Sequence, residues 1–145
     1  IELGRRVVEA GSQRERPAGI KSTEDAVRFC REKFARLAAD GAQEEFHIVT
    51  LDAKNQIVNT HRVSMGLLDQ TLVHPREIFR LAIKDAAKSV ILVHNHPSGD
   101  PTPSEQDRVL TERLEQAGRT VDIQVLDHLI VARNGTVSVR EFRGR

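Results

Sequence analysis

Residues 90–107 read VILVHNHPSGDPTPSEQD and hold the most informative part of the sequence. The apolar run at the start of this stretch predicts a short strand covered on both faces by helices. Side chains alternate along a strand, so His94 and His96 project to one side where the strand ends, whereas Asn95 projects to the other. Pro97 cannot donate to a sheet ladder, and it therefore marks the start of a loop.

The loop leads into a helix predicted from Ser104 to about Ala117. Three prolines restrict the loop backbone, which reduces the conformational entropy lost when the loop is held in one geometry. Ser104 is a suitable N-cap, which places Asp107 in the first helical turn, facing back toward the two histidines. The same Ser-x-x-Asp spacing is also typical of a capping box, which stabilises a helix without any metal.

Two imidazoles and one carboxylate predict a zinc site. Zinc accepts such ligands at about 2.0 to 2.2 Å, and three protein ligands leave a fourth position for water. Bound zinc lowers the pKa of that water toward ~7 and polarises a substrate carbonyl, but a separate base is needed to move the proton. Glu44 and Glu45, at the start of a predicted strand, are the candidate bases. They lie on opposite faces of that strand, and the apolar pattern does not choose between them.

Helices and strands interleave along the chain. Helical spacing and capping residues predict helices over residues 22–41, 75–86 and 104–117. Apolar and β-branched runs predict strands over residues 44–51, 56–63, 89–93, 121–126, 129–132 and 136–139. Together they predict an α/β fold, a three-layer domain with a mixed sheet.

The domain is expected to span residues 22–145. Residues 1–21 are expected to be the end of a helix and a linker, because the segment before residue 20 is rich in Gly, Pro and charge. The first residue is Ile rather than Met, so the chain is expected to be a piece of a longer protein.

Composition narrows the classes of function. The 145 residues suit one domain. The 22 Lys and Arg against 21 Asp and Glu leave a net charge of +1, so no overall field attracts nucleic acid or an anionic membrane. The single cysteine, Cys30, favours a reducing, cytoplasmic setting and leaves metal binding to histidines and carboxylates. No apolar run approaches the roughly 20 residues of a membrane span.

The string His94-Asn95-His96-Pro97, followed by Ser104 and Asp107, resembles the JAMM motif of the MPN metalloprotease family. A longer match, over about residues 22–142, is to the bacterial RadC branch of that family. It further includes Glu44-Glu45-Phe46, Leu51-Asp52, Val73-His74-Pro75-Arg76-Glu77 and Leu126-Asp127-His128-Leu129-Ile130.

The resemblance implies a cytidine-deaminase-like α/β/α sandwich in which His94, His96 and Asp107 bind Zn²⁺. It selects Glu44 as the general base, because the RadC pattern has Glu, any residue and then Phe. It also implies that Ser104 assists the oxyanion. An upstream helix-hairpin-helix region is implied as well, and the N-terminal segment would be its remnant.

The sequence therefore predicts a zinc-dependent metallopeptidase or isopeptidase that acts on a protein or peptide. A zinc nucleobase deaminase is excluded, because its Pro-Cys-x-x-Cys motif is missing. The alternative is a DNA-associated RadC module, linked to DNA repair, whose zinc site is structural or vestigial. Residues 1–36 hold nine Lys and Arg against six acidic residues, too small an excess for a DNA footprint, so nucleic acid would be bound through an upstream region. The sequence does not indicate an oligomeric state.

Several further residues have competing interpretations. His47 and His61 are expected on strand surfaces, and His74 at a helix entry. Asp127-His128 either supports a metal ligand, as carboxylates do for ligating imidazoles, or forms a turn between two strands. Residues 64–71 are expected, by elimination, to form a loop that faces the substrate.

Overall fold

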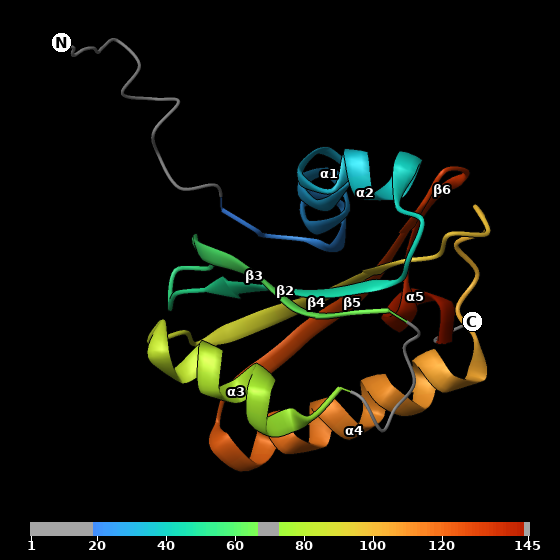
Figure 1. Cartoon of the computed structure of the whole chain (residues 1–145). Helices are drawn as coiled ribbons and strands as arrows, with labels where there is room; N and C mark the ends of the chain where they lie inside the picture. The colour runs from blue at the N-terminus through green and yellow to red at the C-terminus, as the bar shows by residue number, and fades with distance from the viewer. Residues whose placement is uncertain (1–18, 67–72, 144–145) are drawn as a thin grey trace, which may run out of the picture.

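The computed structural model describes residues 19–66 and 73–143 and contains one five-stranded mixed sheet between helices (Figure 1). The strands are β2 (Glu45–Leu51), β3 (Ile57–Met65), β4 (Ser89–Asn95), β5 (Gln124–Ala132) and β6 (Gly135–Ser138). Their order across the sheet is β3-β2-β4-β5-β6. The central pair, β4 and β5, is parallel, and the other neighbouring pairs are antiparallel.

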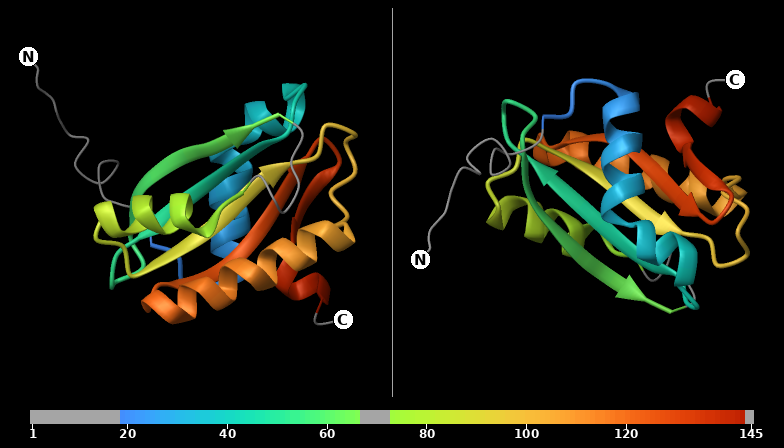
Figure 2. Two further views of the ribbon diagram at one scale, coloured as in Figure 1. Left: turned by 60° about the horizontal axis from the view of Figure 1, so that its bottom comes forward. Right: turned by 90° about the horizontal axis from the view of Figure 1, so that it is seen from above.

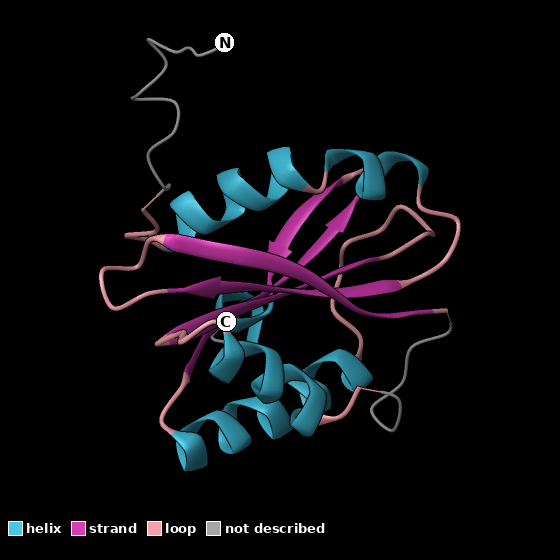
Figure 3. Ribbon diagram, turned by 60° about the vertical axis from the view of Figure 1, so that its left-hand side comes forward, coloured by secondary structure: helices cyan, strands magenta, loops and turns pink. Residues whose placement is uncertain are grey.

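Helices cover both faces of the sheet (Figures 1 and 3). They are α1 (Thr23–Lys33), α2 (Ala35–Asp40), α3 (Pro75–Lys84), α4 (Glu105–Val121) and the short α5 (Val139–Arg143). In Figure 1, α1 and α2 lie above the sheet, and α3 and α4 lie below it. The predicted α/β fold with a mixed sheet between helical layers is confirmed.

The central strand separates two hydrophobic clusters. All seven residues of β4 are buried. Val90 and Leu92 pack with α3 and α4, whereas Ile91 and Val93 pack with α1. By the same alternation, His94 lies on the face that α4 covers. Figure 2 shows the loop after β4 turning at one end of the sandwich and leading into α4, which runs back across the sheet.

The prediction of one continuous helix over residues 22–41 is wrong. The helix is interrupted at Phe34, whose backbone angles are φ −108° and ψ 24°, and α2 begins at the next residue. The Phe34 side chain is buried, and its ring makes an edge contact with the His47 ring at a centroid distance of 5.0 Å. Helical periodicity does not reveal this break, because it accompanies a contact with a strand distant in sequence.

The prediction of two strands joined by a turn at Asp127-His128 is also wrong, because β5 is continuous. The two polar residues resemble a turn in the sequence, but both are buried. Asp127 accepts hydrogen bonds from Ser138 Oγ, and His128 bonds to Thr111 Oγ1. The preceding helix is longer than predicted, since α4 ends at Val121.

Two predicted segments lie partly or wholly outside the described residues. They are the N-terminal helix end and linker up to residue 18, and residues 67–71 of the predicted substrate-facing loop. Within the described ranges, no helix combines the length and the hydropathy that a bilayer span requires.

Candidate metal centre

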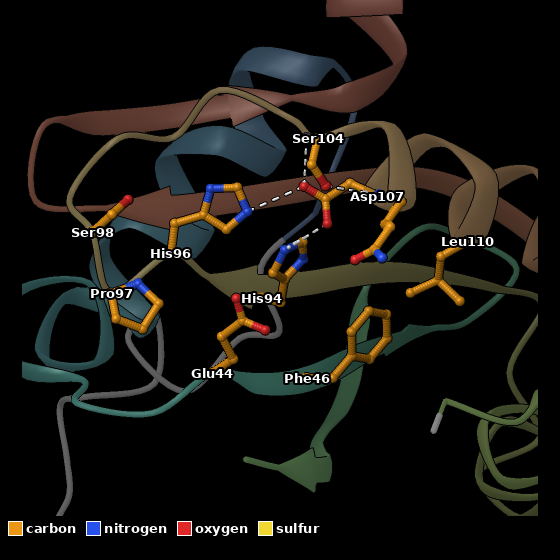
Figure 4. A pocket seen from close by; sticks show the side chains of 10 residues that line it. Glu44, Phe46, His94, His96, Pro97, Ser98, Ser104, Asp107 and Leu110 are labelled. Carbon is orange, nitrogen blue, oxygen red and sulfur yellow. Dashed lines mark hydrogen bonds and ion pairs between the residues drawn. The ribbon is translucent and has the colours of Figure 1, made fainter. Parts of the chain in front are cut away.

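A pocket of about 330 Å³ lies where β4 ends beside the N-terminus of α4 (Figure 4). Its lining includes all five residues predicted from the sequence to bind metal or to take part in hydrolysis, although they come from three separate parts of the chain: Glu44, His94, His96, Ser104 and Asp107. The pocket is the place where the chemistry-bearing residues meet.

The three predicted ligands converge on one another. His94 Nε2 lies 3.2 Å from Asp107 Oδ1, and His96 Nε2 lies 3.1 Å from Asp107 Oδ2. One ligand atom from each residue lies within 4.8 Å of the other two. A tetrahedral site with metal–ligand bonds of ~2.0 to 2.1 Å has ligand–ligand separations of about 3.3 Å, close to the two His–Asp distances. This group of residues could hold a metal ion.

A capping box orients the Asp107 carboxylate. The Asp107 N–H donates to Ser104 Oγ at 3.1 Å, and the Ser104 N–H donates to Asp107 Oδ2 at 2.8 Å. The prediction that Ser104 caps α4 therefore agrees with the observed geometry. The cap uses Ser104 Oγ as an acceptor, so the hydroxyl hydrogen is not consumed by it. Capping and a role in the pocket are compatible.

The electrostatics of the pocket favour an ionised Asp107. Burial opposes ionisation, but the contacts with the His94 and His96 imidazoles and the hydrogen bond from the Ser104 N–H outweigh it and hold the pKa of Asp107 well below its usual range. The pKa of His96 is raised: partial burial lowers it, but the bond to Asp107 and the nearby negative charges, including that of Glu44, outweigh burial. The pocket thus attracts positive charge.

The loop between β4 and α4 is held in place by Arg133, which lies in the turn between β5 and β6. Arg133 donates from Nη1 to the Pro97 carbonyl at 3.2 Å and from Nη2 to the Ser98 carbonyl at 3.1 Å. Gly99 has a φ of 95°, a backbone conformation that favours glycine. The next residue, Asp100, offers its carbonyl to His96 Nδ1 at 2.9 Å. Because a carbonyl can only accept, this bond places the proton of a neutral His96 on Nδ1, and Nε2, which is directed at the other ligands, then carries the lone pair.

Glu44 and Glu45 are separated by the fold. Asn95 Oδ1 accepts from the Glu45 N–H at 2.7 Å, and Asn95 Nδ2 donates to the Gln43 carbonyl at 3.0 Å, so the backbone on both sides of Glu44 is held. The Glu45 carboxylate lies 2.9 Å from His47 Nε2. Figure 4 shows the Glu44 carboxylate in the pocket, on the side opposite α4. The structure places Glu44 beside the histidines and leaves Glu45 outside the pocket lining.

The remaining sequence candidates lie outside the pocket lining. His61 pairs with Asp85 at 2.7 Å, and His74 precedes α3 without a side-chain cap bond. The described start of the 64–71 segment does approach the site, because the Gly66 N–H donates to the Glu44 carbonyl at 2.8 Å.

The sequence indicated the Asp127-His128 pair as one possible support of a metal ligand, with the carboxylate as the group that orients the imidazole. Asp127 instead faces Ser138. The contact with His94 is made by His128, whose Nε2 lies 2.7 Å from His94 Nδ1. Had β5 been recognised as one strand paired in parallel with β4, the alternation along it would have placed His128 on the face of His94.

An α/β sandwich with a His-x-His pair, a carboxylate at the next helix and a neighbouring glutamate is the arrangement that defines a JAB/MPN-type domain. A model of the RadC-like JAB domain matches residues 20–144, so the chain belongs to the RadC-like JAB domain family. The resemblance identified in the sequence is confirmed.

Curated relatives include proteins named only as UPF0758 proteins. One from Symbiobacterium thermophilum is 57% identical over 98 residues, which cover 68% of this chain and 42% of the relative. Others from Listeria monocytogenes and Geobacillus thermodenitrificans are each 43% identical over 141 residues, covering 97% of this chain and 60% of the relative. The chain thus spans between 42% and 60% of the length of these relatives.

Proposed function

We propose that this domain is a zinc-dependent metallopeptidase or isopeptidase that hydrolyses an amide bond in a protein or peptide. The observation that carries the proposal is the convergence of His94, His96 and Asp107 on one side of a pocket whose other side presents Glu44. Two imidazoles and one carboxylate suit zinc better than magnesium or calcium, which prefer oxygen ligands.

Zinc bound by these three residues would activate water and polarise the substrate carbonyl. His94 and His96 would hold the ion through Nε2, and the capping box would keep the Asp107 carboxylate oriented toward it. Since β4, the loop that follows it and α4 fix these side chains, little rearrangement of the protein would be needed for binding.

Glu44 would act as the general base. Its carboxylate faces the pocket and contributes negative charge at His96, so it can accept a proton from attacking water and return it to the leaving amine. Ser104 would use its hydroxyl hydrogen to stabilise the oxyanion that develops on the substrate carbonyl, while Ser104 Oγ continues to cap α4.

The test combines zinc binding with hydrolysis. The chain should bind one zinc per molecule and cleave peptide or isopeptide substrates, and Glu44→Gln should lower kcat by about 100-fold or more while zinc still binds. Glu45→Gln is the matched control: it removes the neighbouring carboxylate, which is not part of the pocket lining, and should retain kcat within about 3-fold, well short of the loss expected for a general base.

A folded chain that binds no zinc would contradict the proposal. Equal losses of activity in the two variants would remove Glu44 from its assigned role. Stoichiometric zinc binding without hydrolysis of either type of bond would favour the structural zinc site of a DNA-associated module instead.

A further inference from the structure

His128 is a fully buried imidazole with both ring nitrogens in short hydrogen bonds. Its Nε2 lies 2.7 Å from His94 Nδ1, and its Nδ1 lies 2.6 Å from Thr111 Oγ1. Thr111 is also fully buried and lies one helical turn after Asp107 on α4. The chain of hydrogen bonds therefore connects β4, β5 and α4 directly behind the candidate metal centre.

The chemistry of these atoms restricts where the protons can lie. Thr111 Oγ1 is 2.7 Å from the Asp107 carbonyl oxygen, which can only accept a hydrogen bond. When Thr111 donates to this carbonyl, His128 donates from Nδ1 to Thr111 and accepts at Nε2 from the His94 Nδ1–H. His94 Nε2 then carries a lone pair on the side of the Asp107 carboxylate.

The opposite direction is incompatible with a metal at this place. If Thr111 donated to His128, a neutral His128 would donate from Nε2 to His94 Nδ1. A neutral His94 would then carry its proton on Nε2, the atom that lies 3.2 Å from Asp107 Oδ1, and that nitrogen would have no lone pair for a metal.

Packing keeps the two rings in place. The Phe46 ring stacks on His94 at a centroid distance of 6.0 Å and an interplanar angle of 14°, and it meets the His128 ring edge-on at 5.6 Å. His94 itself is only 2% exposed. His96 is oriented more simply, by the Asp100 carbonyl, because it lies at the start of the loop. The main-chain groups of β4 are engaged in the sheet, so the ring of His94 is oriented by a side chain, that of His128.

We propose that His128 is a positioning residue that, together with Thr111, holds His94 in the tautomer whose Nε2 can bind a metal ion. The proposal rests on the proposed function, because it requires His94 to be a metal ligand. Groups that accept a hydrogen bond from a ligating imidazole contribute typically 10- to 100-fold to metal affinity.

The test measures zinc affinity and proton positions. His128→Leu should weaken zinc binding by about 10- to 100-fold, whereas His128→Gln, whose amide oxygen can still accept from His94 Nδ1, should restore most of the affinity. Thr111→Val should weaken binding in the same direction, and Thr111→Ser should not. Ile130→Val, a change in the buried residue paired with His94 across the sheet, is the control for packing, with affinity expected to stay unchanged.

Nitrogen-15 NMR of the zinc-loaded wild-type chain provides a second measurement that requires no variant. It should find the proton of His94 on Nδ1 and the proton of His128 on Nδ1. A proton on His128 Nε2, or wild-type affinity in both His128→Leu and Thr111→Val, would overturn the proposal. A wild-type chain that binds no zinc would instead overturn the proposed function.

Discussion

At the scale of single residues, Asn95 links the two halves of the candidate site. It lies between the two histidines in sequence, but its side chain projects to the opposite face of β4 and is 1% exposed. From there it bonds to the backbone of both Gln43 and Glu45. The position of the Glu44 carboxylate therefore depends on a side chain that does not line the pocket.

This dependence predicts that Asn95→Leu lowers kcat by about 10- to 100-fold, because small displacements of reacting groups are costly. Zinc affinity should change by less than about 3-fold, because the metal ligands stay in place. Removing a group that bonds directly to a metal ligand would cost more affinity than this. Steady-state hydrolysis and a zinc titration measure the two quantities. Val93→Ala, a truncation on the same face of β4 without a polar contact, should leave kcat unchanged. Parallel losses of kcat and affinity in Asn95→Leu would show that Asn95 does not act through Glu44.

The three candidate metal ligands could be identified from the sequence because their spacing is local. Strand alternation unites His94 and His96, and one helical turn from Ser104 positions Asp107. His128 could not be identified in the same way, because its contact with His94 depends on the parallel pairing of β4 and β5. Pairing between distant strands leaves little trace in a single sequence.

At the scale of elements, the N-terminus of α4 both stabilises the helix and supplies two residues of the pocket lining. The capping box satisfies backbone N–H groups that would otherwise lack partners, and the same two side chains line the pocket. Because Ser104 and Asp107 bond to each other in the cap, the start of the helix and the orientation of the Asp107 carboxylate are linked.

Replacement of Ser104 separates these two contributions. Ser104→Ala should lower the free energy of unfolding by about 1 kcal/mol, because the Asp107 N–H loses its acceptor. It should also lower kcat by about 100-fold if the hydroxyl stabilises the oxyanion. Ser104→Thr retains the hydroxyl and should show neither loss. Denaturant unfolding and hydrolysis well below the unfolding temperature measure the two effects. A stability loss with full activity would restrict Ser104 to capping.

Elements defined by local patterns, such as β4 and α4, could be predicted, whereas those that depend on tertiary contacts could not. The break at Phe34 accompanies the burial of its ring against β2. The continuity of β5 depends on partners for Asp127 and His128 that come from β6 and α4. In both places a distant contact overrides the local preference.

At the scale of the whole molecule, one carboxylate adds a polar link between the end of α3 and two neighbouring strands, β2 and β3. Asp85, immediately after α3, accepts hydrogen bonds from Thr50 Oγ1 on β2 at 2.8 Å and from His61 Nε2 on β3 at 2.7 Å. Partial burial opposes its ionisation, but these bonds outweigh burial and lower the pKa of Asp85. The folded state therefore binds a proton at Asp85 less readily than the unfolded chain does.

This difference predicts a pH-dependent contribution to stability. Because the folded pKa lies below the unfolded value of about 3.9, the contribution of Asp85 is complete above that value and is lost as the pH falls through the folded pKa. Asp85→Asn should lower the free energy of unfolding by about 1–2 kcal/mol at neutral pH, since hydrogen bonds to a charged group are weakened. The difference from wild type should shrink below about pH 4, because the Asp85 carboxyl of the wild type then becomes neutral, as the amide of the variant is at every pH. Asp122→Asn, at a carboxylate whose side chain is 96% exposed, should change stability by less than about 0.5 kcal/mol at any pH. Urea unfolding of the three chains between pH 3 and 7 measures these differences. If the wild type keeps its full excess in free energy of unfolding over Asp85→Asn at the acid end, the contribution of Asp85 comes from packing rather than from the carboxylate charge.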